Sequence, residues 1–172
     1  NTIDANEQHY EVPAEYFKAV LGPRLKYSCC WFDDQSTTLG EAEIKMMESY
    51  IERAKIEDGQ TILDLGCGWG SLSLFLAERF PNSAIYSVSN SNDQIEHIKH
   101  IAKEKNLENL HPEVQDVNSL TLNQQFDRVV SIEMFEHMRN YQALLQKVKH
   151  LLKPDGLLFI HIFCHKETAY LY

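Results

Sequence analysis

The feature that most constrains the fold is a glycine-rich turn between an apolar, strand-like run and an apolar, helix-like run. The turn reads Asp64-Leu-Gly66-Cys-Gly68-Trp-Gly70. Glycines at such a junction let the chain turn sharply and let its backbone approach a ligand closely. The first N–H groups of the following helix can receive a carboxylate, while the Asp64 carboxylate can receive an ammonium group. The amino-acid end of a ligand carries both charges and fits this turn.

Two other interpretations of the turn remain open. The glycines can serve chain geometry alone, with no ligand. A dinucleotide is the competing ligand, but its G-x-G-x-x-G fingerprint requires Gly or Ala where Ser71 stands. The observed G-x-G-x-G spacing favours S-adenosylmethionine.

Strand-like and helix-like segments alternate along the chain after the first 57 residues. Strands are expected at 61–65, 84–88, 113–117, 126–132 and 156–163, and helices at 71–80, 93–105 and 141–152. Such alternation predicts a parallel sheet with right-handed crossovers. We therefore predict an α/β, Rossmann-like core over residues 58–172, with strand order 3-2-1-4-5 and flanking helices.

Residues 1–57 predict a helical N-terminal segment. Residues 11–21 favour a short helix that a Gly-Pro pair ends, and the aromatic, cysteine-rich stretch 26–32 reads as a loop. Thr38 and Glu41 form a capping box for a second helix. The apolar face of that helix is expected to carry Ile44, Met47, Ile51 and Ala54.

The charge and composition exclude several classes of protein. A formal net charge of −9 disfavours nucleic acid as a partner, because phosphate binding needs clustered Lys and Arg. With 44% hydrophobic and 24% charged residues, the chain resembles one ordinary globular domain. It shows no apolar run of membrane-spanning length and no signal-peptide pattern. A cytoplasmic protein is therefore expected, and a homodimer is left open.

The cysteines and histidines predict no metal site. The four cysteines form neither a C-x-x-C pair nor a spaced quartet, so reduced and mostly buried thiols are expected. Cys164 and His165 are adjacent, but two candidate ligands are too few for zinc. A thiol nucleophile at Cys164 is the remaining alternative there.

An ionisable cluster, Glu133, Glu136 and His137, follows the fourth expected strand directly. Open α/β sheets bind ligands beyond the carboxyl ends of their strands, so the cluster is expected to face a site. A carboxylate can orient an ammonium group, and His or Glu can take its proton. The alternative is a simple helix start, since acidic residues favour a first helical turn.

Five stretches of the chain together resemble one known family of proteins. They are residues 9–13, 25–30, 64–71, 131–138 and 153–159. The resemblance is to the class I S-adenosylmethionine-dependent methyltransferases, and in particular to the branch that holds the coclaurine N-methyltransferase-like enzymes and the related cyclopropane fatty acid synthases. It implies a class I methyltransferase core whose strands 6 and 7 are absent from this chain, with S-adenosylmethionine as methyl donor.

The resemblance also implies a set of cofactor contacts around Asp64. Tyr27 and Ser28 would touch the amino-acid end from a lid-like segment, above Gly66 and Gly68. Many class I methyltransferases place an acid after the second strand to grip the ribose, but this chain does not, so an amide would take that role. The other implied positions are Ser89, Asn90 and Gln94 at the ribose, Asp116 and Val117 at the adenine, and Ser131 below the sulfonium.

The two halves of the branch differ at the acceptor. In its N-methyltransferases, the position of Glu133 binds the amine, while those of Glu136 and His137 share the base role. In its cyclopropane synthases, positions matching Glu136, His137 and His161 hold a bicarbonate, and the residue at Glu133 is small, often Gly. Because Glu133 would repel an anion, we predict N-methylation of a small amine, such as a tetrahydroisoquinoline.

Three alternatives to N-methylation stay open. The first is methylene transfer to an unsaturated phospholipid acyl chain. The second is a non-catalytic S-adenosylmethionine-binding module, which would work normally without Glu136 and His137. The third and most distant is a dinucleotide oxidoreductase, which tight nicotinamide-cofactor binding would establish.

Overall fold

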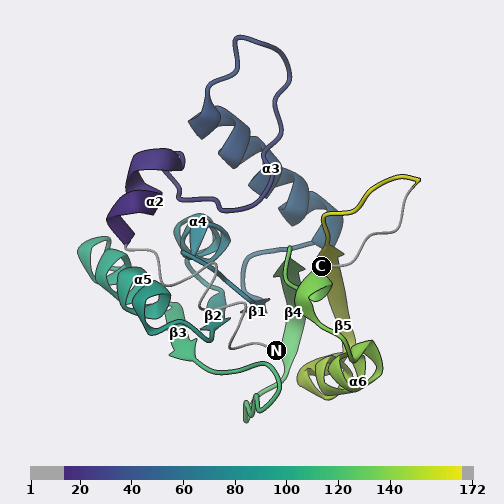
Figure 1. Cartoon of the computed structure of the whole chain (residues 1–172). Helices are drawn as coiled ribbons and strands as arrows, with labels where there is room; N and C mark the ends of the chain where they lie inside the picture. The colour runs from purple at the N-terminus through teal and green to yellow at the C-terminus, as the bar shows by residue number, and fades with distance from the viewer. Residues whose placement is uncertain (1–13, 168–172) are drawn as a thin grey trace.

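Five parallel strands form the centre of the protein, whose computed structural model describes residues 14–167 (Figure 1). The strand order is β3-β2-β1-β4-β5, which confirms the predicted topology. Parallel strands need helical crossovers, and the alternating sequence pattern supplies them. The strands are β1 (Thr61–Leu65), β2 (Ala84–Ser89), β3 (Leu110–Val114), β4 (Phe126–Ile132) and β5 (Leu152–His161).

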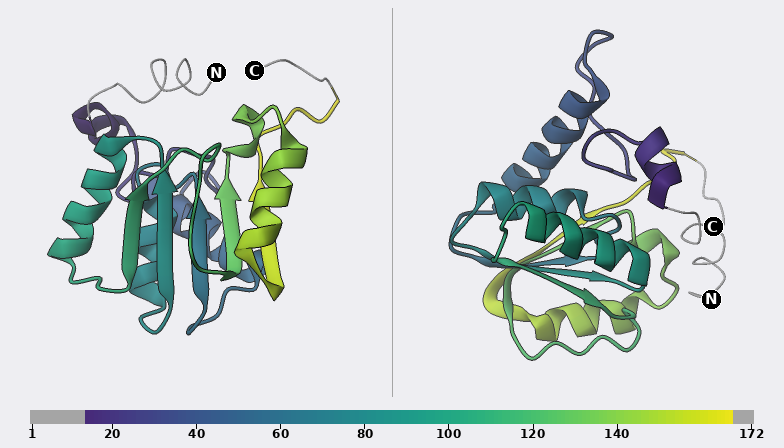
Figure 2. Two further views of the ribbon diagram at one scale, coloured as in Figure 1. Left: turned by 90° about the horizontal axis from the view of Figure 1, so that it is seen from below. Right: turned by 90° about the vertical axis from the view of Figure 1, so that its left-hand side faces the viewer.

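Helices cover both faces of this sheet (Figure 2). They are α2 (Ala14–Val20), α3 (Leu39–Ala54), α4 (Ser71–Arg79), α5 (Asn92–Glu104), the short η1 (Phe135–His137) and α6 (Tyr141–Leu151). Side chains of α3, α4 and α5 share one hydrophobic cluster, and those of α6 belong to a second. In β1, Ile62 joins the first cluster and Leu63 the second, as expected of a strand buried on both faces.

Most predicted helix ends agree with the structure to within a residue. The exception is the helix expected at 11–21, of which residues 11–13 lie outside the described part of the chain; α2 occupies Ala14–Val20. The capping box of α3 is confirmed: Thr38 accepts from the Glu41 N–H, and Glu41 accepts from the Thr38 N–H.

Within residues 14–167, no helix combines the length and apolar character needed to cross a membrane.

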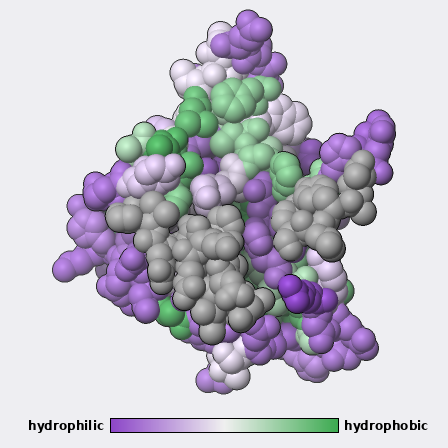
Figure 3. All heavy atoms as spheres, in the orientation of Figure 1, coloured by the Kyte–Doolittle hydropathy of each residue, from purple (hydrophilic) through white to green (hydrophobic). Residues whose placement is uncertain are grey.

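The predicted apolar face of α3 is partly wrong. Ile44 is 40% exposed, and the buried residues of α3 are Ala42, Glu43, Met47, Tyr50 and Ala54. The face is rotated because Glu43 turns inward to bind backbone N–H groups of residues 24 and 26. Apolar surface therefore remains around α3 and the loop before it (Figure 3).

The third strand exists, but its predicted bounds, 113–117, are wrong. The strand is Leu110–Val114, pairing Leu110 with Ile85 and Val114 with Ser89 of β2. Pro112 lacks the N–H that a central strand needs, but β3 is an edge strand, where a missing N–H is tolerated. Residues 116 and 117 consequently lie in the loop beyond the carboxyl end of β3.

The last strand begins earlier than predicted, at Leu152 rather than residue 156. Leu152 pairs with Phe126 and Leu157 with Arg128, so residues 153–156 form an irregularity in the ladder. Lys153 Nζ donates to Asp127 Oδ2 at 2.6 Å across this irregularity. A Lys-Pro-Asp-Gly sequence reads as a turn, and here the turn is built into the strand.

Candidate active site

A small cavity lies at the carboxyl ends of β1 and β4 and collects many of the predicted site residues. Its volume is about 70 Å³. Pockets for whole small molecules usually measure about 300–1,000 Å³, so this one fits one end of an extended ligand. The predicted residues that line it are Tyr27, Ser28, Asp64, Gly66, Gly68 and Glu133.

The glycine turn between β1 and α4 forms the floor of the cavity. Gly66, Gly68 and Gly70 all have positive φ, at 85°, 53° and 80°. The N–H groups of Gly66 and Cys67 both donate to the Val88 carbonyl, at 2.9 and 3.0 Å, which joins the turn to β2. A side chain at Gly70 would lie 2.4 Å from Ile98 Cγ1, whereas one at Gly68 would have no described atom within 4 Å. Gly70 therefore serves packing against α5, and Gly68 leaves space beside the cavity.

Alanine substitutions should separate these two roles. Gly70→Ala should lower the free energy of unfolding by about 3 kcal/mol, because left-handed strain and overpacking add. Gly68→Ala should cost only about 1 kcal/mol, since strain acts there without a clash. Urea unfolding of both variants measures the difference. Equal losses would contradict this division of roles.

Asp64 is the buried acid of the cavity. It lies in β1, is 2% exposed and accepts a hydrogen bond of 2.6 Å from Ser73 Oγ. Burial raises the pKa of its carboxyl to about 6, against the lowering effects of the Ser73 hydrogen bond and the Lys26 charge. A cation bound in the cavity would favour the carboxylate form.

Lys26 is a site residue that the sequence analysis missed. Its side chain is buried, and Nζ donates to the Cys29 carbonyl at 2.8 Å, to Tyr50 Oη at 3.1 Å and to Ser28 Oγ. Burial lowers the pKa of this ammonium group. The contacts hold the Tyr27–Cys30 loop against α3. A single Lys between Leu25 and Tyr27 carries no periodic signal that could have predicted this.

Glu133 has a left-handed backbone, with φ of 50°. Its N–H donates to the His161 carbonyl at 2.8 Å, and its Oε1 accepts from the Cys29 N–H at 3.0 Å. A left-handed conformation costs a residue with a side chain about 1–2 kcal/mol, and such strain clusters at functional sites. This strained residue is one of those that line the cavity.

Glu136 and His137 lie in η1, apart from the cavity that Glu133 lines. Glu136 Oε1 accepts from the Phe163 N–H at 2.9 Å, and its Oε2 is buried without a hydrogen-bond partner among the described residues. His137 is exposed and lines another hollow of about 430 Å³, which it shares with Val117. Of the predicted acceptor cluster, Glu133 thus lines the small cavity and His137 lines the other hollow.

The predicted ribose residues meet at the carboxyl end of β2. Ser89 Oγ donates to Gln94 Oε1 at 2.7 Å and accepts from the Ser91 N–H at 3.1 Å. Gln94 is buried, and its Nε2 has no hydrogen-bond partner among residues 14–167. Asn90 is half-buried between them in the chain. The Gln94 side-chain amide, which was predicted to bind the ribose, thus has an N–H group available to donate a hydrogen bond to a ligand.

The remaining predicted cofactor residues lie around the other strand ends. Asp116 Oδ1 accepts from the N–H and the side-chain amide of Asn118, at 2.8 and 2.9 Å. The Val117 carbonyl accepts from Lys147 Nζ at 2.8 Å. Ser131 is fully buried, and its hydroxyl donates to the Leu65 carbonyl at 2.8 Å, so it joins β4 to β1 behind the cavity.

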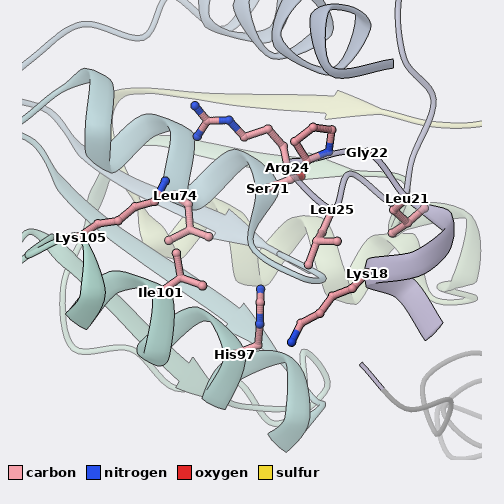
Figure 4. Close-up of a pocket in the computed structure, with 11 residues that line it drawn as sticks. Lys18, Leu21, Gly22, Arg24, Leu25, Ser71, Leu74, His97, Ile101 and Lys105 are labelled. Atoms are coloured by element: carbon pink, nitrogen blue, oxygen red, sulfur yellow. The ribbon is translucent and has the colours of Figure 1, made fainter. Parts of the chain in front are cut away.

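A larger hollow of about 500 Å³ lies between α2, α4 and α5 (Figure 4). Lys18 and His97 reach toward one another across it, and burial is the main cause that lowers the His97 pKa. Arg24 and Lys105 also line it, but both are paired with Glu78. None of the predicted site residues lines this hollow.

The strand order, the glycine turn after β1 and the acidic cluster after β4 define a Rossmann-like fold of the class I methyltransferase kind. The family model described as mycolic acid cyclopropane synthetase matches residues 1–171. The chain belongs to this family.

Similar proteins include members of both halves of the branch. The chain is 46% identical over 171 residues to (S)-coclaurine N-methyltransferase of Thalictrum flavum subsp. glaucum, covering 99% of this chain and 47% of that protein. It is 32% identical over 164 residues to cyclopropane-fatty-acyl-phospholipid synthase of Escherichia coli K12, covering 94% of this chain and 41% of that protein. The chain spans about half the length of the curated relatives it matches.

Among solved structures, a coclaurine N-methyltransferase bound to N-methylheliamine and SAH superposes with a TM-score of 0.90. It is 44% identical in sequence, and the match covers 93% of this chain and 47% of that one. A mycolic acid cyclopropane synthase complexed with SAH gives a TM-score of 0.81 at 28% identity, over 91% of this chain and 55% of that one.

Proposed function

We propose that the protein carrying this chain transfers a methyl group from S-adenosylmethionine to the nitrogen of a small amine. The observation that carries the proposal is Glu133, a strained acidic residue that lines the same cavity as Asp64 and the glycine turn. A carboxylate there suits an ammonium group. The relatives named coclaurine N-methyltransferase and pavine N-methyltransferase support the same activity.

The cavity and the strand ends around it suit S-adenosylmethionine. Asp64 and the N-terminus of α4 offer opposite charges to an amino-acid end. Gly68 leaves space beside the cavity, and the buried, spare Nε2 donor of Gln94 suits a ribose hydroxyl. When bound, this cofactor supplies a methyl group already activated by a positively charged sulfur.

The chain's own residues would position the amine and manage its proton. Glu133 would bind the ammonium form and orient its nitrogen. Glu136 and His137 would share removal of the proton that makes the amine nucleophilic. The exposed position of His137 would let it pass that proton to solvent. Asp116 and Val117 would border the adenine, and Ser131 would support the floor from behind.

Methylene transfer to an unsaturated phospholipid acyl chain is the second candidate. It is favoured by His161, whose ring lies near Glu133 in the position of a bicarbonate-binding histidine of cyclopropane synthases. The Glu133 carboxylate opposes it, because two anions would have to share one small space. A non-catalytic cofactor-binding module is the third candidate.

Trideuteromethyl S-adenosylmethionine distinguishes the three functions. We expect the natural, full-length protein, given a panel of cyclic amines and unsaturated phospholipids, to form an amine product that keeps all three deuterium atoms. A lipid product that keeps only two would establish methylene transfer and show that our assignment of Glu133 is wrong. Cofactor binding without any labelled product, unchanged in Glu136→Ala and His137→Ala variants, would establish a module.

We further propose that the protein is cytoplasmic and has no nucleic-acid partner. A homodimer is possible. Size-exclusion chromatography with light scattering would measure the oligomeric state directly.

A further inference from the structure

Three potential metal ligands from distant parts of the sequence converge beside the cavity. They are Cys29 in the loop before α3, Glu133 after β4 and His161 at the end of β5. One ligand atom from each lies within 4.8 Å of the other two. A thiol, a carboxylate and an imidazole are the ligand types that zinc prefers in proteins. Within residues 14–167 the fold assembles a set that sequence spacing could not reveal.

The spacing of these atoms is close to that of a tetrahedral metal site. Bonds of about 2.0–2.3 Å to a tetrahedral zinc place the ligand atoms roughly 3.3–3.8 Å apart. Cys29 Sγ lies 3.7 Å from His161 Nε2, within that range. Cys29 Sγ also lies within 4.8 Å of the Glu133 carboxylate. Small side-chain rotations would therefore complete the geometry.

The ligand side chains are already held in place by their neighbours. Tyr50 Oη lies 2.8 Å from His161 Nδ1, so the second ring nitrogen has the outer partner that metal-bound histidines usually have. The Cys29 N–H fixes Glu133 Oε1 at 3.0 Å. The Glu133 N–H in turn binds the His161 carbonyl. The exposure of Cys29 gives an ion access from solvent.

The nearest opposing charge is the ammonium group of Lys26, which donates to the Cys29 carbonyl and to Tyr50 Oη. It would repel a cation. The Cys29 thiolate and the Glu133 carboxylate together bring two negative charges, which exceed the one positive charge of Lys26. A divalent cation thus leaves the local cluster with one net positive charge, which solvent at the exposed side can screen.

We propose that Cys29, Glu133 and His161 form a binding site for a thiophilic divalent cation such as Zn²⁺, with the fourth position open to water. On binding, the Cys29 S–H bond breaks, its proton goes to solvent and the thiolate sulfur bonds the metal. If the proposed function holds, Glu133 is also the amine ligand, so the cation and the amine should compete for it.

Cobalt(II) titration of the reduced, full-length protein tests the site without using activity. We expect one Co²⁺ per site, with a thiolate-to-cobalt charge-transfer band and the visible bands of tetrahedral coordination, all abolished by added Zn²⁺. Cys29→Ser should weaken binding about 100-fold or more, and Tyr50→Phe about 10-fold through the imidazole. Cys30→Ser, the adjacent thiol, is the matched control and should leave the bands unchanged.

Circular dichroism and thermal unfolding of each variant establish that a lost band does not reflect a lost fold. Absence of the bands in the folded wild-type protein, or their persistence in Cys29→Ser, would overturn the proposed site. A saturating amine should raise the apparent Kd for Co²⁺. Cobalt binding by a protein that methylates no amine would refute the proposed function and leave the metal site standing.

Discussion

The Glu133→Gln protein should fold normally, bind S-adenosylmethionine as well as the wild type does, and methylate amines about 100- to 1,000-fold less efficiently in kcat/KM. The amide keeps the shape of the side chain and an oxygen that can accept from the Cys29 N–H. What it loses is the negative charge that would orient the ammonium group. Steady-state kinetics together with isothermal titration of the cofactor separate the two effects. Retention of kcat/KM within tenfold would remove Glu133 from the amine site.

The strained backbone of Glu133 supplies an independent measurement. At φ of 50°, glycine avoids the clash that any side chain meets, so Glu133→Gly should be about 1 kcal/mol more stable than Glu133→Ala. Lys55, with φ of 52° at the C-terminus of α3, is the matched control. The same pair of substitutions there should show the same difference in urea unfolding. Activity should fall only at Glu133.

Asp64→Asn should abolish the pH dependence of cofactor binding. The wild-type affinity for S-adenosylmethionine should rise as pH increases through about 6, because the carboxylate, and not the neutral acid, binds the ammonium group. Above that pH the variant should bind about 30- to 100-fold more weakly, as expected for a lost charge-assisted contact of 2–3 kcal/mol. Titration calorimetry from pH 5 to 8 measures both. Equal affinities at pH 8 would show that Asp64 does not hold the cofactor.

The free energy of unfolding should change with pH in the direction opposite to the cofactor affinity, because of the same Asp64 carboxyl. Its folded pKa is raised from 3.8 to about 6, so the folded state binds more protons than the unfolded state between these values. The free energy of unfolding therefore falls as pH rises across this window, by up to about 3 kcal/mol. Asp64→Asn removes this loss and keeps an oxygen for Ser73. The variant should accordingly be the more stable protein at pH 7 and the weaker binder.

The order of the strands could be predicted because the apolar runs, the glycine turn and the helix signals agree with one another. The errors have local causes. Proline is unfavourable in most strands, so the pattern around Pro112 did not predict a strand that begins at Leu110. The Lys153–Gly156 sequence is typical of a turn, so the start of β5 was predicted too late. The apolar face of α3 was misjudged because burial of Glu43 is a tertiary effect that hydrophobic periodicity does not contain.

Some residues of the candidate site could likewise be predicted from the sequence, and others could not. Residues that belong to a continuous motif, such as Asp64 and Gly68, could be predicted from the turn and do line the cavity. Lys26 and Tyr50 could not, because a hydrogen bond between a loop and a helix leaves no pattern in either segment. The separation of His137 from Glu133 depends on the backbone direction after β4, which sequence spacing does not specify.

Hydrogen bonds between residues 24–31 and α3 fix one wall of the cavity in advance of ligand binding. Glu43 holds the Arg24 and Lys26 N–H groups, and the Trp31 N–H donates to the Ala42 carbonyl. The wall that carries Tyr27 and Ser28 is thus one rigid body with the helix. Tyr27 and Ser28 are therefore already in place beside the cavity before a ligand arrives. A ligand that binds there has little chain entropy to remove from this wall, so less of its contact energy is lost to ordering the protein.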